Sequence, residues 1–545
     1  MNNRAIWLMT AASALCSGLC LADDRTMDGT GNNLANNSWG SAHSNLLRGT
    51  SGAHYVDGFG AMLDRGNPRA ISNAISSQVA PVGNARLLSS MTWQWGQFID
   101  HDFALVEAGS EFMPIPIPTG DPMFDPGGTG TQFMDFTRNA FTGGTPGNPR
   151  QHSNVITHWI DGSQVYGSDD ARGMGLRTGT GGMLRSGADG MLPLNTTGLP
   201  NAPTNAPIFR VAGDIRSNEQ TGLTAMHTLF MREHNRVAAA VGAANPGMTD
   251  EQIYQRARKI VGAEIQSITY NEWLPALMGG NSLGSYTGYN PAVDGTLNTA
   301  FSTAAFRVGH TLLNEQLLRF NEDGSEYAGG HLTLFQTFFN TATMQNSADL
   351  SSVLRGLARQ QANEIDPQAI DSVRNFLFGD PTPTPRDLIA TNLARGRDHG
   401  IPDYNSIRAD YGLTPVTSFS EITSDAALAA ALQAAYGGDV NNIDAWIGLM
   451  AEDHLPGGSF GLTLTTVFNE QFGRLRDGDR FFYLNDSELS PADIAMIESM
   501  TLSRIIQMNT DVVGIQPGVF FVPAPASGML LAGFGWMLTN RRRRA

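Results

Sequence analysis

The sequence predicts a mainly α-helical protein with long ordered loops and little β-structure. Apolar residues recur with helical periodicity in several segments of the 545-residue chain, and these segments contain few alternating β-branched residues. Strand patterns are short and weak, and proline and glycine are dense between the helical segments. The chain is 41% hydrophobic and 16% charged, which predicts a large, compact core.

The predicted elements begin with an irregular arm at residues 23–80, which is rich in Asn, Gly, Ser and Ala. A helix is predicted at residues 85–106. Residues 111–152 contain too many prolines and glycines for regular elements. Helical periodicity then predicts four further helical segments, at residues 221–243, 251–269, 296–319 and 347–362.

The N-terminal segment has the pattern of a targeting signal. Residues 1–22 combine Arg4, an apolar run and small residues ahead of Asp23. This pattern predicts a secretory signal peptide that is cut after Ala22. A buried first helix is the structural alternative.

The C-terminal segment, residues 521–545, contains prolines, a short apolar run and the arginines Arg541 to Arg544. It is similar to the PEP-CTERM sorting signal of Gram-negative bacteria, although Ala524 stands where glutamate is usual. A simple membrane tail is the alternative. Because such arginines stay cytoplasmic, the body would lie outside. The sequence thus predicts an exported protein, extracellular or on the outer surface of a Gram-negative bacterium, with attachment to the cell surface or to an exopolysaccharide matrix as a candidate interaction.

Cysteine usage and charge argue against several classes of partner. Cys16 and Cys20 are the two cysteines and lie in the predicted signal peptide, so the mature chain would have no disulfide and no disulfide-linked partner. Five of the 35 basic residues lie in the two terminal segments, which leaves 30 against 51 acidic residues in the body, a net charge of −21. This balance argues against nucleic acid and against an anionic membrane surface.

The first candidate site is the stretch WQWGQFIDHDF at residues 93–103. On a helix, Gln97, Asp100 and His101 share one face, whereas Asp102 points nearly to the opposite side. A neutral histidine in a cavity wall can shuttle a proton. A histidine satisfied within the core is the structural alternative.

The second is the stretch VITHWIDGSQVYGSD at residues 155–169. Four of its residues recur at every second position, namely Thr157, Trp159, Asp161 and Ser163. In an extended loop they would share one side and offer a carboxylate, hydroxyls and backbone carbonyls, which suit Ca²⁺. Asp102 would add a second carboxylate. An ordinary Asp-Gly turn with capping hydroxyls is the alternative.

The third lies at residues 212–236, where Arg216 and Glu219 precede a helix. The structural alternative is an acidic residue in the first helical turn, which favours the helix dipole. His227 and His234, further along this helix, are interpreted as packing or capping residues.

The fourth is the stretch FSTAAFRVGHTLL at residues 301–313. His310 follows Gly309 in an apolar helix, so a flat cofactor could approach closely; a packed core histidine is the alternative. The segment NLARGRDHGIPDYN is too polar for a core and offers Asn392 and Arg395 as partners.

These segments, in this order, resemble the animal-type haem peroxidases, the family of myeloperoxidase, lactoperoxidase, thyroid peroxidase and peroxidasin. The resemblance runs from about residue 40 to 515 and implies a peroxidase domain over residues 23–520. It includes the stretches GGDVNNIDAWIGLMAE (437–452), QFGRLRDGDRFFY (471–483) and LSRIIQMNT (502–510).

The resemblance implies a haem b site with assigned roles. His310 would be the proximal ligand of the iron, and Asn392 would accept the other ring N–H. Arg307 and Arg395 would neutralise the haem propionates or brace this side. His101 would be the distal base that moves the peroxide proton.

Further distal roles follow from the same resemblance. Arg216 would stabilise the negative charge that develops as the O–O bond breaks, and Gln97 would hold peroxide, water or a halide. Asp100 and Glu219 match two carboxylates that form ester bonds to haem in this family. Gln220 stands where myeloperoxidase has methionine, so a third, sulfonium link is not expected.

The resemblance also implies a calcium site. Its ligands would be Asp102, Thr157, Trp159 (through its carbonyl), Asp161 and Ser163. The mammalian relatives are rich in disulfides, whereas the mature chain would have none, a difference that does not touch the haem site.

The implied function is that of a secreted haem peroxidase. It would reduce hydrogen peroxide and oxidise a halide, thiocyanate or phenolic donor, by distal His/Arg heterolysis of the O–O bond and a high-valent iron-oxo intermediate. One alternative is a fatty-acid dioxygenase, which needs a tyrosine beside the haem, and Tyr404 is the candidate. The other is an inactive, calcium-braced scaffold, which the presence of His101 and Arg216 disfavours.

Overall fold

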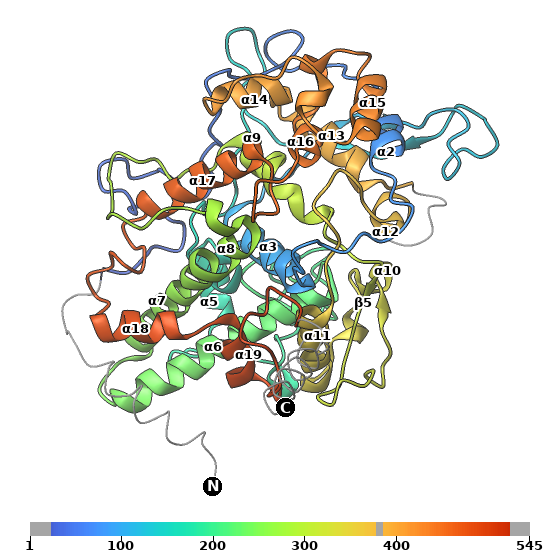
Figure 1. The fold of residues 1–545 in the computed structure, drawn as a ribbon. Helices are drawn as coiled ribbons and strands as arrows, with labels where there is room; N and C mark the ends of the chain where they lie inside the picture. The colour runs from blue at the N-terminus through green and yellow to red at the C-terminus, as the bar shows by residue number, and fades with distance from the viewer. Residues whose placement is uncertain (1–22, 378–384, 524–545) are drawn as a thin grey trace, which may run out of the picture.

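The computed structural model describes residues 23–377 and 385–523. It is mainly helical with long loops, so the predicted fold class is confirmed (Figure 1). The predicted signal peptide and all but three residues of the predicted C-terminal sorting segment lie outside the described residues. In the described part of the chain, no helix is both long and apolar enough to cross a membrane.

The helices of the described chain are α2 (Pro68–Ile75), α3 (Ser90–Phe103), α4 (Ser163–Tyr166), α5 (Asp170–Leu176), α6 (Thr221–Ala244), α7 (Asp250–Ile268), α8 (Leu274–Met278), α9 (Thr299–Thr303), α10 (Leu334–Thr337), α11 (Ser347–Arg359), α12 (Asp371–Arg374), α13 (Leu388–Asp398), α14 (Tyr404–Asp410), α15 (Ala426–Ala435), α16 (Ala445–Ala451), α17 (Leu462–Asp477), α18 (Pro491–Ser499) and α19 (Leu502–Asn509). The strands are β1 (Ala108–Phe112), β2 (Ile115–Pro116), β3 (Phe133–Met134), β4 (Thr137–Asn139), β5 (Gln316–Leu317) and β6 (Leu332–Thr333), which form three antiparallel pairs, β1 with β4, β2 with β3 and β5 with β6.

Helix α3 lies in the middle of the molecule, with α6 and α7 on one side and α13, α14 and α16 on the other (Figure 1). Its aromatic residues explain this position, because Trp95, Phe98 and Phe103 are fully buried. Phe98 stacks on Phe230 of α6 with 4.9 Å between ring centroids. Burying one such side chain stabilises the fold by about 1.5–3 kcal/mol, so this seam fixes α3 firmly against α6.

Most predicted helices are confirmed to within a few residues of their ends, but one is wrong. Residues 296–319 form the short helix α9 and then a separate 3₁₀ helix, η4 (Ala305–His310), instead of one long helix. Ala304 leaves the helical conformation between them, with φ −125° and ψ −63°. Glycine in a helix costs about 1 kcal/mol relative to alanine, so Gly309 also weakens a continuous helix here.

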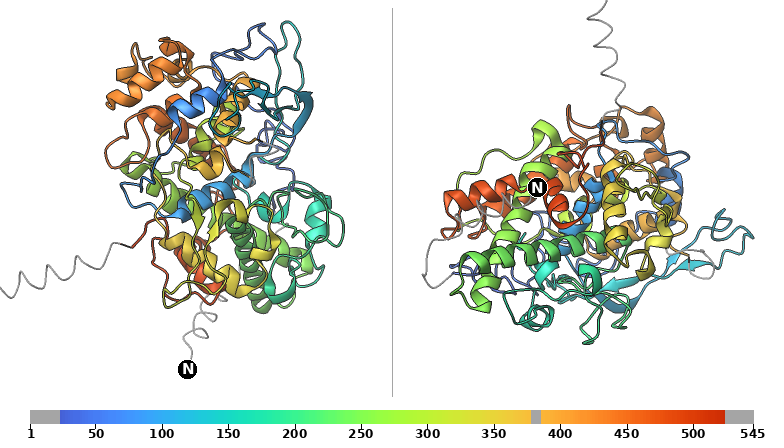
Figure 2. Two further views of the ribbon diagram at one scale, coloured as in Figure 1. Left: turned by 90° about the vertical axis from the view of Figure 1, so that its right-hand side faces the viewer. Right: turned by 90° about the horizontal axis from the view of Figure 1, so that it is seen from below.

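Two predicted irregular regions contain short elements. The N-terminal arm includes α2, whose first turn begins at Pro68 and is capped by Asn67. The proline-rich segment that follows α3 forms the pairs β1–β4 and β2–β3 and projects from the edge of the helical body (Figures 1 and 2).

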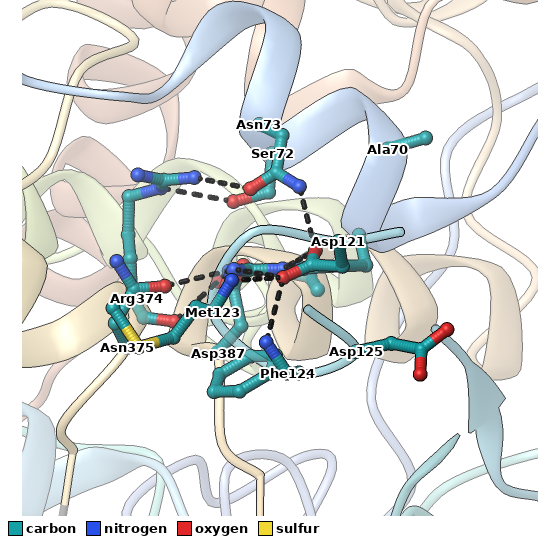
Figure 3. Close-up of polar contacts among 12 residues, drawn as sticks. Ala70, Ser72, Asn73, Asp121, Met123, Phe124, Asp125, Arg374, Asn375 and Asp387 are labelled. Atoms are coloured by element: carbon teal, nitrogen blue, oxygen red, sulfur yellow. Dashed lines mark hydrogen bonds and ion pairs between the residues drawn. The ribbon is translucent and has the colours of Figure 1, made fainter. Parts of the chain in front are cut away.

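A buried polar network joins this projecting segment to α2 and α13. Asp121, Asn375 and Asp387 come from three separate segments and turn towards one another (Figure 3). Arg69 of α2 lies between them, with Nε 2.8 Å from Asp121, Nη1 2.7 Å from Asp387 and Nη2 2.8 Å from the Asn375 oxygen. Asp387 also caps the first turn of α13, so the network fixes the N-terminus of the helix that carries Asn392.

Candidate active site

A cavity of about 320 Å³ lies between α3, η4 and the start of α6. Ligand pockets of this size and larger hold small molecules and cofactors. Its lining is mostly apolar, but it brings together seven of the residues predicted for the site: Gln97, Asp100, His101, Arg216, Glu219, Arg307 and His310.

The two faces of α3 separate as the helical spacing predicts. Gln97, Asp100 and His101 line the cavity. Asp102 is fully buried on another side, where its carboxylate accepts the backbone N–H groups of Gly162 at 3.2 Å and Ser163 at 2.5 Å. The polar side chains of this one helix therefore lie in two different environments.

His101 is held in its neutral form. Burial and the nearby Arg216 guanidinium lower the pKa of His101 well below its ordinary value of 6.5. Its Nε2 lies 3.8 Å from the Glu219 carboxylate in the cavity, and its Nδ1 lies 3.5 Å from the buried Asp214 carboxylate. A neutral imidazole can accept a proton, and a carboxylate near its second nitrogen stabilises the resulting positive charge.

Arg216 is fixed in place by the same acid. Its Nε and Nη2 each lie 2.9 Å from an Asp214 oxygen, a two-point contact that holds the guanidinium plane. Its Nη1 lies 3.4 Å from Asp100. Burial alone would raise the pKa of Asp214, but Arg216 outweighs it and holds this pKa below its ordinary value. A rigid cation therefore faces the cavity.

His310, at the end of η4, contacts Asn392 with 2.9 Å between its Nδ1 and the amide nitrogen. The prediction had the Asn392 oxygen facing this nitrogen, and the structure has the reverse. The reason is Arg307, whose Nη1 donates to the Asn392 oxygen at 2.8 Å. Iron ligation by His310 Nε2 requires the ring proton on Nδ1, so the Asn392 amide would have to turn and release Arg307.

Arg395 does not line the cavity. Its guanidinium contacts Asp398 at 2.7 Å and the Thr137 carbonyl at 3.1 Å, and it lies 4.4 Å from the Phe136 ring centroid. In this position it braces α13 against β4. Of the two roles predicted for it, the structure favours bracing over contact with a cofactor.

Asp100 and Glu219 face the cavity from α3 and from the residues before α6, and each side chain is about one-third exposed to it. Burial raises the pKa of Asp100 to about 6 and that of Glu219 to about 7. Two acids that resist ionisation are compatible with the predicted ester links, in which both groups would be neutral.

These shifts predict how the haem-free protein responds to pH. In the unfolded chain the two acids have pKa values of 3.8 and 4.5, whereas in the folded chain they hold their protons up to about pH 6 and 7. The folded state therefore binds more protons between about pH 4 and pH 7, and its stability falls as the pH rises through this window. The slope of the melting temperature against pH, measured by thermal unfolding across this range, tests the prediction.

The double variant Asp100→Asn, Glu219→Gln removes both titrating groups and should give a flatter slope over the same window. Protein carrying an esterified haem should resemble it, because an ester does not titrate there. A slope identical to that of the unsubstituted haem-free protein would show that the two acids do not cause it.

The cavity fits a haem in three respects. A Cβ added at Gly309 would meet nothing within 4 Å, so the wall beside His310 is open. The Arg307 Nε is buried and has no hydrogen-bond partner among the described residues, as expected of a guanidinium that awaits an anionic group such as a propionate. His310 makes its contact with Asn392 through Nδ1, so Nε2 would be the ligating nitrogen once the Asn392 amide has turned.

The predicted calcium residues also lie together. Thr157 Oγ1 donates to Asp161 at 3.1 Å, and Ser163 Oγ donates to the Asp102 carbonyl at 2.5 Å. Burial and the neighbouring Asp161 carboxylate raise the pKa of Asp102 well above 3.8. Within the described chain no group of three or more His, Cys, Asp or Glu side chains could hold a metal, so hydroxyl and carbonyl oxygens would complete this site. Two buried acids with oxygen neighbours fit Ca²⁺.

Sequence reasoning missed Asp214, which holds Arg216 by two hydrogen bonds and lies 3.5 Å from His101 Nδ1. Its only sequence signal is its place two residues before Arg216. The interpretation of His234 as structural agrees with its contacts, since Tyr166 and the Gly182 carbonyl occupy both ring nitrogens. His227 packs beside His101 and contacts the Gln164 carbonyl at 3.0 Å.

Comparison with known proteins gives a consistent result. The family described as animal haem peroxidase matches residues 24–520. Peroxinectin A of Dictyostelium discoideum is 34% identical over 519 residues, which cover 91% of this chain and 95% of that protein. A human peroxidasin homolog is 35% identical over 93% of this chain, which spans 38% of that relative's length.

Solved structures agree on the fold. Peroxidase A from Dictyostelium discoideum superposes with a TM-score of 0.85 at 32% identity, covering 92% of this chain and 100% of that one. A fatty acid alpha-dioxygenase from Arabidopsis thaliana reaches a TM-score of 0.76 at 20% identity over 92% of this chain and 84% of that one, which shows a shared fold alone. The chain belongs to the animal haem peroxidase family, and its enzyme class is that of a haem peroxidase.

Proposed function

We propose that this protein reduces hydrogen peroxide and oxidises a small donor, a halide, thiocyanate or a phenol, with a haem bound between His310 and His101. The observation that carries the proposal is one cavity lined by a neutral histidine with a carboxylate nearby, by a fixed arginine and by a second histidine from η4. These are the groups that peroxide cleavage needs: a base, a cation and a metal ligand.

A haem held by His310 would supply the two electrons for cleavage of the O–O bond, and the small donor would return them. His101 Nε2 takes a proton from one peroxide oxygen and returns it to the other, which leaves as water. Asp214, 3.5 Å from Nδ1, stabilises the imidazolium during this transfer. Arg216 stabilises the negative charge on the departing oxygen, and its contacts with Asp214 mean that it need not reorganise.

We propose that Asp100 and Glu219 hold the haem through two esters and that Gln97 anchors peroxide, water or a halide. The raised pKa values of the two acids support the esters. A calcium ion bound by Asp102, Thr157, the Trp159 carbonyl, Asp161 and Ser163 would hold the far face of α3. Export to the cell surface or beyond is proposed from the sequence pattern of residues 1–22 and 521–545 alone.

The fatty-acid dioxygenase alternative would need a tyrosine at the haem. Among the described residues that line the cavity, none is a tyrosine. Tyr404 is fully buried and donates to Glu452 at 2.5 Å, away from the cavity lining. The peroxidase function is therefore favoured.

The test uses the purified full chain loaded with haem. We expect a strong Soret absorption band, haem that resists extraction by acidified butanone, and consumption of hydrogen peroxide with bromide, thiocyanate or guaiacol. Oxygen uptake with a fatty acid, in the absence of peroxide-dependent donor oxidation, would establish the dioxygenase instead. A chain that binds no haem would refute both, and haem that extracts freely would refute the esters.

A further inference from the structure

Three glutamine side chains form a hydrogen-bonded chain beside the cavity. Gln220, which lines the cavity and caps α6, donates from Nε2 to the Gln94 oxygen at 2.5 Å and to the Gln97 oxygen at 2.9 Å. Gln94 donates to the same Gln97 oxygen at 3.4 Å. Gln97 in turn donates from its own Nε2 to Glu219 Oε1 at 3.3 Å.

The direction of this chain is fixed at its first link. The backbone N–H of Gly222 lies 2.6 Å from the Gln220 side-chain oxygen, and a backbone N–H can only donate. The Gln220 nitrogen must therefore face the other two glutamines, and the Gln97 oxygen must face Gln220. Gln94 and Gln220 are buried, at 0% and 3% exposure, so water does not compete for these bonds.

We propose that Gln220 is a positioning residue, which fixes Gln97 with its amide N–H group directed into the cavity and so makes the cavity selective for a small anionic donor. An amide nitrogen carries two N–H groups, and the contact with Glu219 uses one of them. The second makes no hydrogen bond among the described residues, and Gln97 lines the same cavity as Arg216. A halide or thiocyanate needs N–H donors and a cation, whereas a carbonyl oxygen at this place would repel it.

The inference deepens the proposed function and rests on the anchoring role given to Gln97 there. It predicts that the residue at position 220 controls anion affinity through Gln97 and not by touching the anion itself. This can be measured without turnover, by titrating bromide or thiocyanate into the resting haem protein and following the absorption spectrum.

Two variants of Gln220 separate orientation from packing. Gln220→Glu presents only acceptors, so Gln97 should turn its nitrogen towards position 220 and its oxygen into the cavity. The lost charge-assisted hydrogen bond should raise the bromide Kd about tenfold. Gln220→Leu fills the space but makes no hydrogen bond, so both amide orientations become available and the Kd should rise only about twofold.

The negative charge of Gln220→Glu could weaken anion binding directly, so the measurement is repeated with Gln97→Leu in both backgrounds. If Gln97 mediates the effect, Gln220→Glu should change the bromide Kd much less when residue 97 cannot present an amide. At saturating bromide, Gln220→Glu should oxidise bromide at the rate of the unsubstituted protein. A damaged active site would not recover in this way.

An equal rise in Kd from Gln220→Glu in both backgrounds would overturn the proposal, because the charge alone would explain it. Equal effects of Gln220→Leu and Gln220→Glu would also overturn it, since orientation would not matter. These failures differ from a failure of the proposed function, which would show as an absent Soret band or as no peroxide consumption in the unsubstituted protein.

Discussion

Replacing His101 with Leu is expected to slow peroxide consumption by about 10²–10⁴-fold, the usual contribution of a positioned acid or base. Haem content should stay the same, because the predicted iron ligand and ester residues remain. Stopped-flow measurement of the first reaction with hydrogen peroxide isolates this step from oxidation of the donor.

The environment of His101 also predicts the shape of the pH profile. Burial and Arg216 lower its pKa well below 6.5, so the imidazole stays neutral and able to accept a proton in mildly acidic solution. The acidic limb of the rate profile should therefore lie below pH 6.5, the ordinary histidine value. In the His101→Leu variant this limb should disappear.

His227 provides a matched control. It is also a buried histidine, 6.0 Å from His101 between ring centroids, but it does not line the cavity. His227→Gln should leave the peroxide rate close to that of the unsubstituted protein. If both variants lose activity equally, the loss reflects disturbed packing between α3 and α6. Full activity in His101→Leu would contradict the role of His101 as the base.

The two-sided character of α3 could be predicted because it depends on helical spacing alone. A helix turns by a fixed angle per residue, so Gln97, Asp100 and His101 must share a face and Asp102 must leave it. The same reasoning predicts the ends of α6, α7 and α11 to within a few residues. Their long apolar stripes leave few alternatives to a helix.

Other features depend on partners that are distant in sequence. Asp214 becomes important only because the fold places it beside His101. The direction of the Asn392 amide depends on Arg307, 85 residues away. The Gln220 chain is directed by a backbone N–H, and no side-chain pattern reveals this. The break at Ala304 was missed because alanine is a good helix former, and tertiary packing overrides that preference.

Replacing Asp102 with Asn is expected to lower the free energy of unfolding in saturating calcium by about 4 kcal/mol, the stabilisation that a ligand provides at about a thousand times its Kd. Asp102 and Asp161 are both buried, and the Asp161 carboxylate raises the cost of ionising Asp102. A divalent cation removes this repulsion. Denaturant unfolding in calcium and in a chelator should differ for the unsubstituted protein and coincide for Asp102→Asn.

Asp493 separates a calcium effect from the loss of any buried acid. It is buried in the capping box of α18 and contacts Arg256 at 2.8 Å, far along the chain from the calcium residues. Asp493→Asn should lose stability but keep its response to calcium. Because Asp102 directly follows His101 on α3, removing calcium should also slow peroxide cleavage in the unsubstituted protein. If the chelator changes neither unfolding nor rate, then hydrogen bonds to Gly162 and Ser163, and no metal, hold this face of α3.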